Sequence, residues 1–285
     1  MGNVALVHKR GLSSFRMLAM GTWRTAKDPS VYGAIEINMD ASLRFLEAFR
    51  ARTGKRATVT HLMAMAIARV LHEVPDANAV LRFWRVYLRQ DVDVFFQVAM
   101  KDPESGQVDL SGVTLRRVDQ KSLTTIVDEF EAAAAKVRAG KDAEKESTRQ
   151  LFKKMPGFIV GPVLDLVAFL TYTLNLNLSF LGLPKDPFGG VMVTNVGSLG
   201  LEEAYAPLVP YSRVPLLVGV GAIRKVPVVA EHDTLVVAHM MRLCATFDHR
   251  LLDGAHAAKM VAILKDSFAH PDKHFGGEGV DARRS

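Results

Sequence analysis

The spacing of hydrophobic residues changes along the chain between an alternating pattern, typical of strands, and a three- to four-residue pattern, typical of helices. In the first half, Asp40 caps the first predicted helix, Gly54 ends it, and Pro75 closes the second. In chain order, the pattern predicts a strand over 31–37, helices over 40–54 and 60–75, β-rich runs over 80–88, 92–100 and 113–118, and a helix over about 122–138 that ends at Gly140.

The second half repeats this mixture of strands and helices. It predicts strands over 191–194 and 216–222, a hairpin that pairs 227–229 with 235–246, and a last helix over about 255–268. No repeat of solenoid length and no linker rich in Ser, Gly or Pro divides the sequence. We therefore expect a single α/β domain over residues 1–285, with a loose tail from about Pro271.

An apolar segment at about 155–187 stands apart from the rest of the pattern. Its central part, 158–183, is rich in Leu, Val and Phe, but Pro162, Asp165 and three later polar residues interrupt it. An Asp costs about 3 kcal/mol at the centre of a bilayer. We therefore expect a pair of short amphipathic or buried helices here, and not a membrane span. A helix that lies on a membrane surface or against another subunit is the alternative.

Composition limits the classes of function. The chain has 285 residues, of which 49% are hydrophobic and 23% charged, so it can bury a large core and is not a disordered protein. Its only cysteine, Cys244, cannot form an internal disulfide, and no Cys/His cluster has zinc spacing. With no secretory signal at the start, we expect a cytoplasmic protein without a metal.

The net charge of +6 would allow an anionic partner, but it is small for a chain of this length. The basic stretch at 136–154 has no aromatic residue until Phe152, so we expect no nucleic-acid partner. Phosphate groups of a small cofactor account for the charge equally well.

The best candidate for chemistry lies at 246–255, where a β-type run stops and a helix starts. His249 lies at this junction, and Asp253 follows it in a strand-to-helix turn, where proteins often present functional side chains. The alternative is structural: Asp253 is only the N-cap of the last helix, and His249 is a partly buried histidine with its hydrogen bonds satisfied.

The string Asp248-His249-Arg250-Leu251-Leu252-Asp253-Gly254 resembles the His-x-x-x-Asp-Gly signature of the catalytic domain of the 2-oxo-acid dehydrogenase acyltransferases, or dihydrolipoamide acyltransferases. Residues 192–200 look like the Ser/Thr-Asn-x-Gly segment of that family, and residues 75–79 are similar to its Pro-x-x-Asn-Ala step. The matches span about 13–268, in order and at family-like spacing.

The resemblance implies a fold and a mechanism. The expected fold is α/β, a two-layer sandwich of a mixed β-sheet with helices, as in the related chloramphenicol acetyltransferase, and the expected assembly is a homotrimer or a higher multiple of three. The implied reaction is coenzyme A-dependent acyl transfer, with His249 as general base on an attacking thiol and Thr194 as donor to the oxyanion. Asp253 would hold the loop through an ion pair, for which Arg16 is our candidate. Thr194 can also be read as an ordinary β-branched strand residue.

The partners stay open at this stage. Members of the family in dehydrogenase complexes carry a lipoyl domain and a subunit-binding domain, and neither fits before the resemblance begins. We therefore expect no covalent lipoyl group on this chain, and the acceptor is a thiol, a lipoylated carrier protein or another group. Arg213, Arg224 and Lys225 could meet coenzyme A phosphates or form a solvated basic face.

Two other functions fit part of the sequence. One is a catalytically silent trimeric scaffold or membrane-surface anchor that uses 158–183 to assemble a larger complex. The other is an antibiotic-modifying acetyltransferase, which shares the chemistry but takes a hydroxyl acceptor.

Overall fold

The computed structural model describes residues 2–10, 29–101, 108–139 and 156–277. Within these ranges the strands are β1 (Leu6–His8), β2 (Ser30–Asn38), β3 (Ala79–Arg82), β4 (Arg85–Arg89), β5 (Val94–Lys101), β6 (Val108–Leu115), β7 (Val191–Asn195), β8 (Leu216–Val229) and β9 (Leu235–Asp248). The α-helices are α2 (Asp40–Thr53), α3 (Val59–Glu73), α4 (Leu123–Arg138), α6 (Gly157–Ala168), α7 (Gly254–Ala269) and α8 (Pro271–Phe275).

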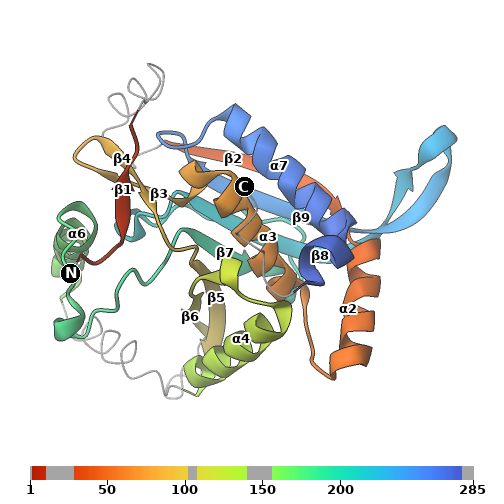
Figure 1. Cartoon of the computed structure of the whole chain (residues 1–285), viewed down its shortest axis with the longest axis horizontal. Coiled ribbons are helices and arrows are strands. Elements are labelled where there is room, and N and C mark those ends of the chain that lie inside the picture. Colours follow the sequence, from red (N-terminus) through yellow and green to blue (C-terminus); the bar gives the residue numbers. More distant parts are fainter. Residues whose placement is uncertain (1, 11–28, 102–107, 140–155, 278–285) are drawn as a thin grey trace.

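One mixed sheet forms the centre of the described chain, with the strand order β2-β9-β8-β7-β5-β6 (Figure 1). Strand β7 runs parallel to β5 and to β8, and the other neighbouring pairs are antiparallel. Parallel neighbours need long crossover connections, which carry the chain out of the sheet between them. The antiparallel β8–β9 hairpin continues beyond the sheet and projects from one side of the molecule (Figure 1).

Helices form the second layer, with α3, α4 and α7 lying over one face of the sheet (Figure 1). Helix α3 is apolar nearly all round, and Leu62, Met63, Ile67 and Val70 on it are 0% exposed. A helix with this pattern must be buried on all sides, which places α3 between its neighbours and the sheet. The two-layer α/β sandwich expected from the sequence is confirmed.

Irregular chain covers part of the opposite face of the sheet. Phe95, Met192 and Leu217 form a small core there with Val214, and the segment that includes Leu208 packs on it. This packing brings the chain that precedes β8 to the end of the sheet where β9 stops.

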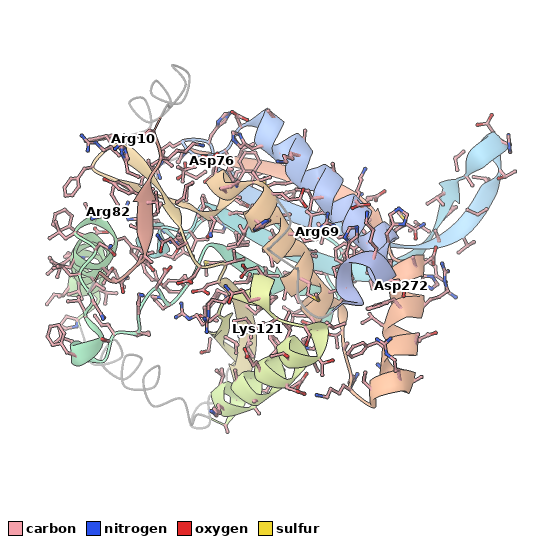
Figure 2. The ribbon with its side chains drawn as sticks, viewed as in Figure 1. Arg10, Arg69, Asp76, Arg82, Lys121 and Asp272 are labelled. Atoms are coloured by element: carbon pink, nitrogen blue, oxygen red, sulfur yellow. The ribbon has the colours of Figure 1, made fainter. Side chains whose placement is uncertain are left out.

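A second, smaller sheet has the order β1-β4-β3, and the apolar segment packs beside it. Tyr172, in a π-helical turn at Phe169–Thr173, is buried with Val4 in a separate small core. Arg82, at the end of β3, donates from Nε to the carbonyl of Thr173 at 3.0 Å (Figure 2). These contacts dock helix α6 and the following turn on the small sheet.

The sequence predicted a pair of short helices here, but the structure has one helical stretch, α6 continued by the π-helical turn, and after it only a single 3₁₀ turn at Ser179–Leu181. None of the helices in the described ranges is long and apolar enough to cross a membrane. Several large apolar side chains of the segment still face outward, among them Leu166 (57% exposed), Leu181 (64%) and Phe180 (78%).

Four predicted boundaries were wrong. The run expected over 113–118 belongs to β6, which covers Val108–Leu115. The run 80–88 is not one strand, because it turns at Phe83 and Trp84, whose positive φ values of 45° and 63° close a tight β3–β4 hairpin without the usual Gly or Asn signal. Residues 216–222 and 227–229 belong to one strand, β8, because a shift in register near Val220 lets β8 stay paired with β9 along both parts. Met39, and not Asp40, is the N-cap of α2.

The tail predicted to be loose from Pro271 starts with an ordered piece. Pro271 opens helix α8, a favourable first helical position for proline because the nitrogen there needs no hydrogen bond. Phe275, at the end of this helix, is 1% exposed and packs against Phe45 and Phe268. The predicted stop at Gly140 lies outside the described residues.

Candidate active site

His249 lies in the tight turn between β9 and α7, the position expected from the sequence. Its backbone N–H donates to the carbonyl of Pro29 at 2.7 Å, which ties the turn to the start of β2. Leu251 and Leu252, two and three residues later, are 2% and 0% exposed and anchor the turn in the core. These contacts fix the loop that carries His249. The residue itself is only partly buried, so it still reaches the surface.

The residues on both sides of His249 form a buried ion pair. Asp248 and Arg250 are 5% and 9% exposed. The Asp248 carboxylate accepts from Nε of Arg250 at 2.9 and 3.1 Å, from its guanidinium NH2 group at 2.6 Å, and from its backbone N–H at 2.9 Å. A bidentate pair of this kind fixes orientation as well as charge, so it holds the backbone on both sides of the histidine.

Asp253 is the N-cap of α7, as the structural alternative expected. Its Oδ1 accepts from the backbone N–H groups of Ala255 and His256 at 3.0 and 3.1 Å. Nδ1 of His256 lies 2.6 Å from the same oxygen, and Nε2 of that ring lies 3.5 Å from a carboxylate oxygen of Asp76, which Figure 2 places near the start of α7. Lys9 pairs with Asp76 in turn. The turn is thus linked to the small sheet. The proposed partner of Asp253, Arg16, lies outside the described residues.

Thr194 lies near the end of β7 and is partly buried. The next residue, Asn195, donates from Nδ2 to the hydroxyl of Thr60 at 3.1 Å and caps the following turn by accepting from Ser198 N–H at 3.1 Å. Gly197 in that turn comes so close to β8 that a Cβ there would meet backbone atoms of Gly221 at 2.6 Å. The segment that carries Thr194 is therefore held rigidly.

The strand register places Thr194 and His249 at different ends of the sheet. Thr194 pairs with Gly219 on β8, and Gly219 pairs with Cys244 on β9. His249 lies five positions beyond Cys244, which corresponds to about 17 Å along the strand. Two side chains cannot bridge that distance, so one chain does not bring the predicted base and the predicted oxyanion donor together.

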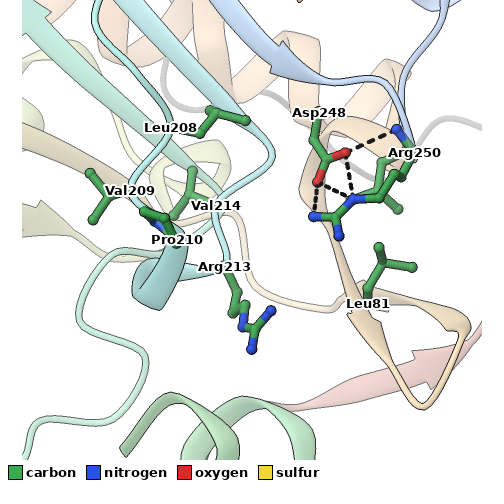
Figure 3. A pocket seen from close by; sticks show the side chains of 9 residues that line it. Leu81, Leu208, Val209, Pro210, Arg213, Val214, Asp248 and Arg250 are labelled. Atoms are coloured by element: carbon green, nitrogen blue, oxygen red, sulfur yellow. Dashed lines mark hydrogen bonds and ion pairs between the residues drawn. The ribbon is translucent and has the colours of Figure 1, made fainter. Parts of the chain in front are cut away.

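A cleft that is open to solvent lies at the turn that holds His249 (Figure 3). Its charged lining consists of Arg213, Asp248 and Arg250. Its apolar lining consists of Leu81, Leu208, Val209, Pro210, Val214 and Leu251. An apolar cleft with a few convergent polar groups is the usual form of a small-molecule site.

The three basic residues predicted to meet coenzyme A do not gather at one place. Arg213 lies in the cleft, whereas Arg224 is eight residues beyond Leu216 on β8, roughly 27 Å along the strand. Arg224 forms an exposed ion pair with Glu202 at 3.1 Å, and Lys225 pairs across β8 and β9 with His239 in the same outer part of the hairpin. No group of three or more potential metal ligands occurs in the described ranges.

Comparison with known proteins decides the family. The sequence model described as "2-oxoacid dehydrogenases acyltransferase (catalytic domain)" matches residues 13–153 and 186–275, most of the chain. The chain belongs to this family of acyltransferases. The match leaves out residues 154–185, which include α6 and the π-helical turn.

The curated relatives of this chain are longer proteins. It is 25% identical over 247 residues to the dihydrolipoyllysine-residue acetyltransferase component of the pyruvate dehydrogenase complex from Rickettsia bellii, a match that covers 85% of this chain and 48% of the relative. It is 24% identical over 220 residues to the lipoamide acyltransferase component of the branched-chain alpha-keto acid dehydrogenase complex from Bacillus subtilis, covering 77% and 41%. The chain thus spans about half the length of the curated relatives it matches.

A solved structure with the same fold is the dihydrolipoamide acetyltransferase of Azotobacter vinelandii, with a TM-score of 0.64, 21% identity, and coverage of 94% of this chain and 93% of that one. That structure was determined to examine the roles of a serine, a histidine and an asparagine in the catalytic mechanism of that enzyme.

The sequence analysis missed some residues of the site. Asp248 and Arg250 were noticed as part of the motif but given no role, although opposite charges two positions apart at the end of an apolar strand indicate a local ion pair. His256 carried a signal too, because it is the third residue after the N-cap, where a side chain can reach back to the cap. Asp76 is far from it in the sequence, so no local pattern could have linked the two.

Proposed function

We propose that this chain is a coenzyme A-dependent acyltransferase whose active site is completed by a second copy. The observation that supports this most directly is the register of the sheet, which separates Thr194 from His249 by about 17 Å along the strand direction. The turn that carries His249 and the strand end that carries Thr194 are both held rigidly, so a large rearrangement within one chain would break many hydrogen bonds. A second copy can supply the missing residue without any such change.

In this proposal His249 accepts the proton of an attacking thiol, and the sulfur then attacks the carbonyl carbon of the acyl thioester. The hydroxyl of Thr194 from the second copy donates a hydrogen bond to the oxyanion that forms. When the bond between the acyl carbon and the sulfur of coenzyme A breaks, the imidazolium returns the proton to the departing thiolate. A positioned base typically contributes about 10²- to 10⁴-fold, and an oxyanion donor about 10²- to 10³-fold.

Asp253 would act through the backbone in this mechanism. Its N-cap bonds and its contact with His256 hold the start of α7, and the bidentate pair of Asp248 and Arg250 holds the other side of the turn. We expect these groups to position His249 without touching the substrate. Arg224 and Lys225 remain our candidates for binding the phosphates of coenzyme A. They lie on the side of the sheet where β7 ends.

The acceptor and the assembly are part of the same proposal. The printed names of the relatives point to dihydrolipoyl groups as acceptors in those proteins, so a lipoylated carrier protein is the first acceptor to test. We expect a homotrimer or a multiple of three, a single domain in which about 155–187 is an insert, and activity in the cytoplasm.

Complementation between two inactive variants tests the shared site. His249→Ala and Thr194→Ala should each lower acyl transfer from acetyl-coenzyme A to dihydrolipoamide by at least about 10²-fold. When the two variants are expressed together, each mixed oligomer contains sites with one intact histidine and one intact threonine from different copies. We expect about a quarter of the wild-type activity to return, because random mixing completes that share of cyclic interfaces.

Three results would contradict the shared site or the assignment of His249 as the base. If both residues act within one chain, every site in the mixture lacks one of them and no activity returns. If His249→Ala leaves thiol-dependent acyl exchange undiminished, the assignment of the base is wrong. A measured mass of a monomer would also contradict a site shared between copies.

A second candidate function is a scaffold or membrane-surface anchor. The observation that favours it is the row of exposed apolar side chains in the segment after α6, with Phe180 78% and Leu181 64% exposed. Flotation with lipid vesicles tests it. Binding that is lost when Leu166, Phe169 and Leu170 become polar supports an anchor, and the absence of binding removes it.

A further inference from the structure

In the described part of the chain, one positive charge in the cleft beside His249 has no close counter-charge. Arg250 is neutralised by Asp248 through the bidentate pair. The guanidinium of Arg213 forms no hydrogen bond and no ion pair within the described ranges, and Asp165 on α6 and Asp248 attract it only from a greater distance. Figure 3 shows Arg213 turned away from the paired side chains. Among the described residues, the cleft therefore offers an unpaired guanidinium between apolar walls.

The backbone holds Arg213 in an uncommon conformation. Its φ of 54° lies in the left-handed region, which costs a residue with a side chain about 1–3 kcal/mol. The turn before it fixes this geometry: the Ser212 hydroxyl donates to the carbonyl of Val209 at 2.7 Å and accepts from Val214 N–H at 3.3 Å. Such strain persists where the surroundings impose it, often at ligand sites.

Arg213 is close to the reacting centre of the proposed site. The carbonyl of Pro215, two residues after Arg213, accepts from the backbone N–H of Asp248, one residue before His249, at 2.9 Å. The two turns thus meet at one edge of the sheet. The phosphates of coenzyme A are separated from its sulfur by the whole pantetheine arm, whereas a carboxylate at the end of a short acyl chain lies a few bonds from the thioester carbon. An anion near both Arg213 and His249 is therefore best placed on the acyl group.

We propose that Arg213 is a specificity residue that selects acyl groups ending in a carboxylate, so that the substrates are coenzyme A thioesters of short dicarboxylic acids. This inference rests on the proposed function and names its substrate class. The apolar side chains, among them Leu208 and Val214, contact the methylene groups, and the guanidinium binds the terminal carboxylate. The carboxylate itself does not react. The bond from the acyl carbon to coenzyme A breaks, the bond to the acceptor sulfur forms, and His249 carries the proton between the two sulfurs.

The experiment compares two thioesters with the same number of acyl carbons, succinyl-coenzyme A and butyryl-coenzyme A, with dihydrolipoamide as acceptor. We expect the wild type to have a kcat/KM for the succinyl group about 10- to 100-fold higher, the size of one hydrogen-bonded charge pair. Arg213→Gln should abolish this preference, and Arg213→Lys should keep part of it. The matched control is Arg44→Gln, which removes an exposed arginine on α2 that is not part of the cleft lining and should leave the preference unchanged.

Equilibrium binding of both thioesters and of free coenzyme A, without acceptor, separates the possible failures. Free coenzyme A should bind Arg213→Gln as tightly as it binds the wild type. If its affinity drops together with that of both thioesters, Arg213 binds a coenzyme A phosphate and the inference is wrong. If the wild type prefers the butyryl group in both binding and transfer, the inference is wrong while the proposed function stands. If neither group is transferred but the succinyl preference in binding depends on Arg213, the proposed function fails and the cleft assignment holds.

Discussion

The buried pair of Asp248 and Arg250 allows the sharpest test of how the His249 turn is held. The substitution Asp248→Ala removes the acceptor of four hydrogen bonds that come from a single residue, three from the guanidinium and one from its backbone N–H. At 9% exposure, Arg250 has little water available to replace them. The guanidinium would then be a buried charge without a partner.

The expected magnitude follows from that arrangement. Removing one member of a buried ion pair costs about 3–5 kcal/mol of unfolding free energy, mainly because the remaining charge is uncompensated. Arg250→Met should cost a similar amount, since among the described residues it leaves the carboxylate of Asp248 with a single backbone donor. The double variant removes both charges, so its loss should be smaller than the sum of the two single losses by about 1–3 kcal/mol.

Urea unfolding of the wild type, both single variants and the double variant, at one protein concentration, measures these differences. Glu202→Ala is the matched control, because it breaks an exposed ion pair with Arg224 and should cost less than about 1 kcal/mol. The reasoning is refuted if Asp248→Ala costs no more than Glu202→Ala. It is also refuted if the two single losses simply add, since the residues would then not act as a pair.

Three further outcomes are expected. Gly197→Ala should lower both stability and acyl transfer, because the new Cβ would meet the backbone of β8 at 2.6 Å; thermal unfolding together with kcat measures this. Asp253→Ala should cost about 1 kcal/mol through the lost N-cap of α7, while Asp253→Asn should cost much less; urea unfolding compares the two. Burial lowers the pKa of His61 in the folded protein below its ordinary value of 6.5. The unfolded chain therefore binds a proton at His61 more readily than the folded chain does, and the wild type loses stability as the pH falls below about 6.5. His61→Gln keeps a residue that suits the capping box of α3 and should lose less stability than the wild type between pH 7.5 and pH 5.5; equal losses in the two proteins would exclude His61 as the titrating group.

Local patterns were sufficient for most of the elements and for the position of the His249 turn. The helix that starts after Thr58 and the strand at 191–194 follow from spacing and end signals that involve residues only a few positions apart. The hairpin at Phe83 and Trp84 did not follow, because bulky residues with positive φ are held there by surrounding structure and carry no turn signal of their own. The helix at Pro271 was missed for a related reason: its stability comes from packing of Phe275 against residues distant in the sequence.

The sequence by itself determined the α/β character of this chain, its acyltransferase motif and the placement of His249 between a strand and a helix, since each depends on residues close together in the chain. Only the tertiary structure decided that Thr194 and His249 lie at different ends of the sheet, because that separation depends on the register of three strands from distant parts of the sequence. It also decided that, among the described residues, Arg250 has an ion-pair partner in Asp248 while Arg213 has none. Charge balance in a cleft depends on which side chains meet in three dimensions, and the spacing of hydrophobic residues along the chain does not specify it.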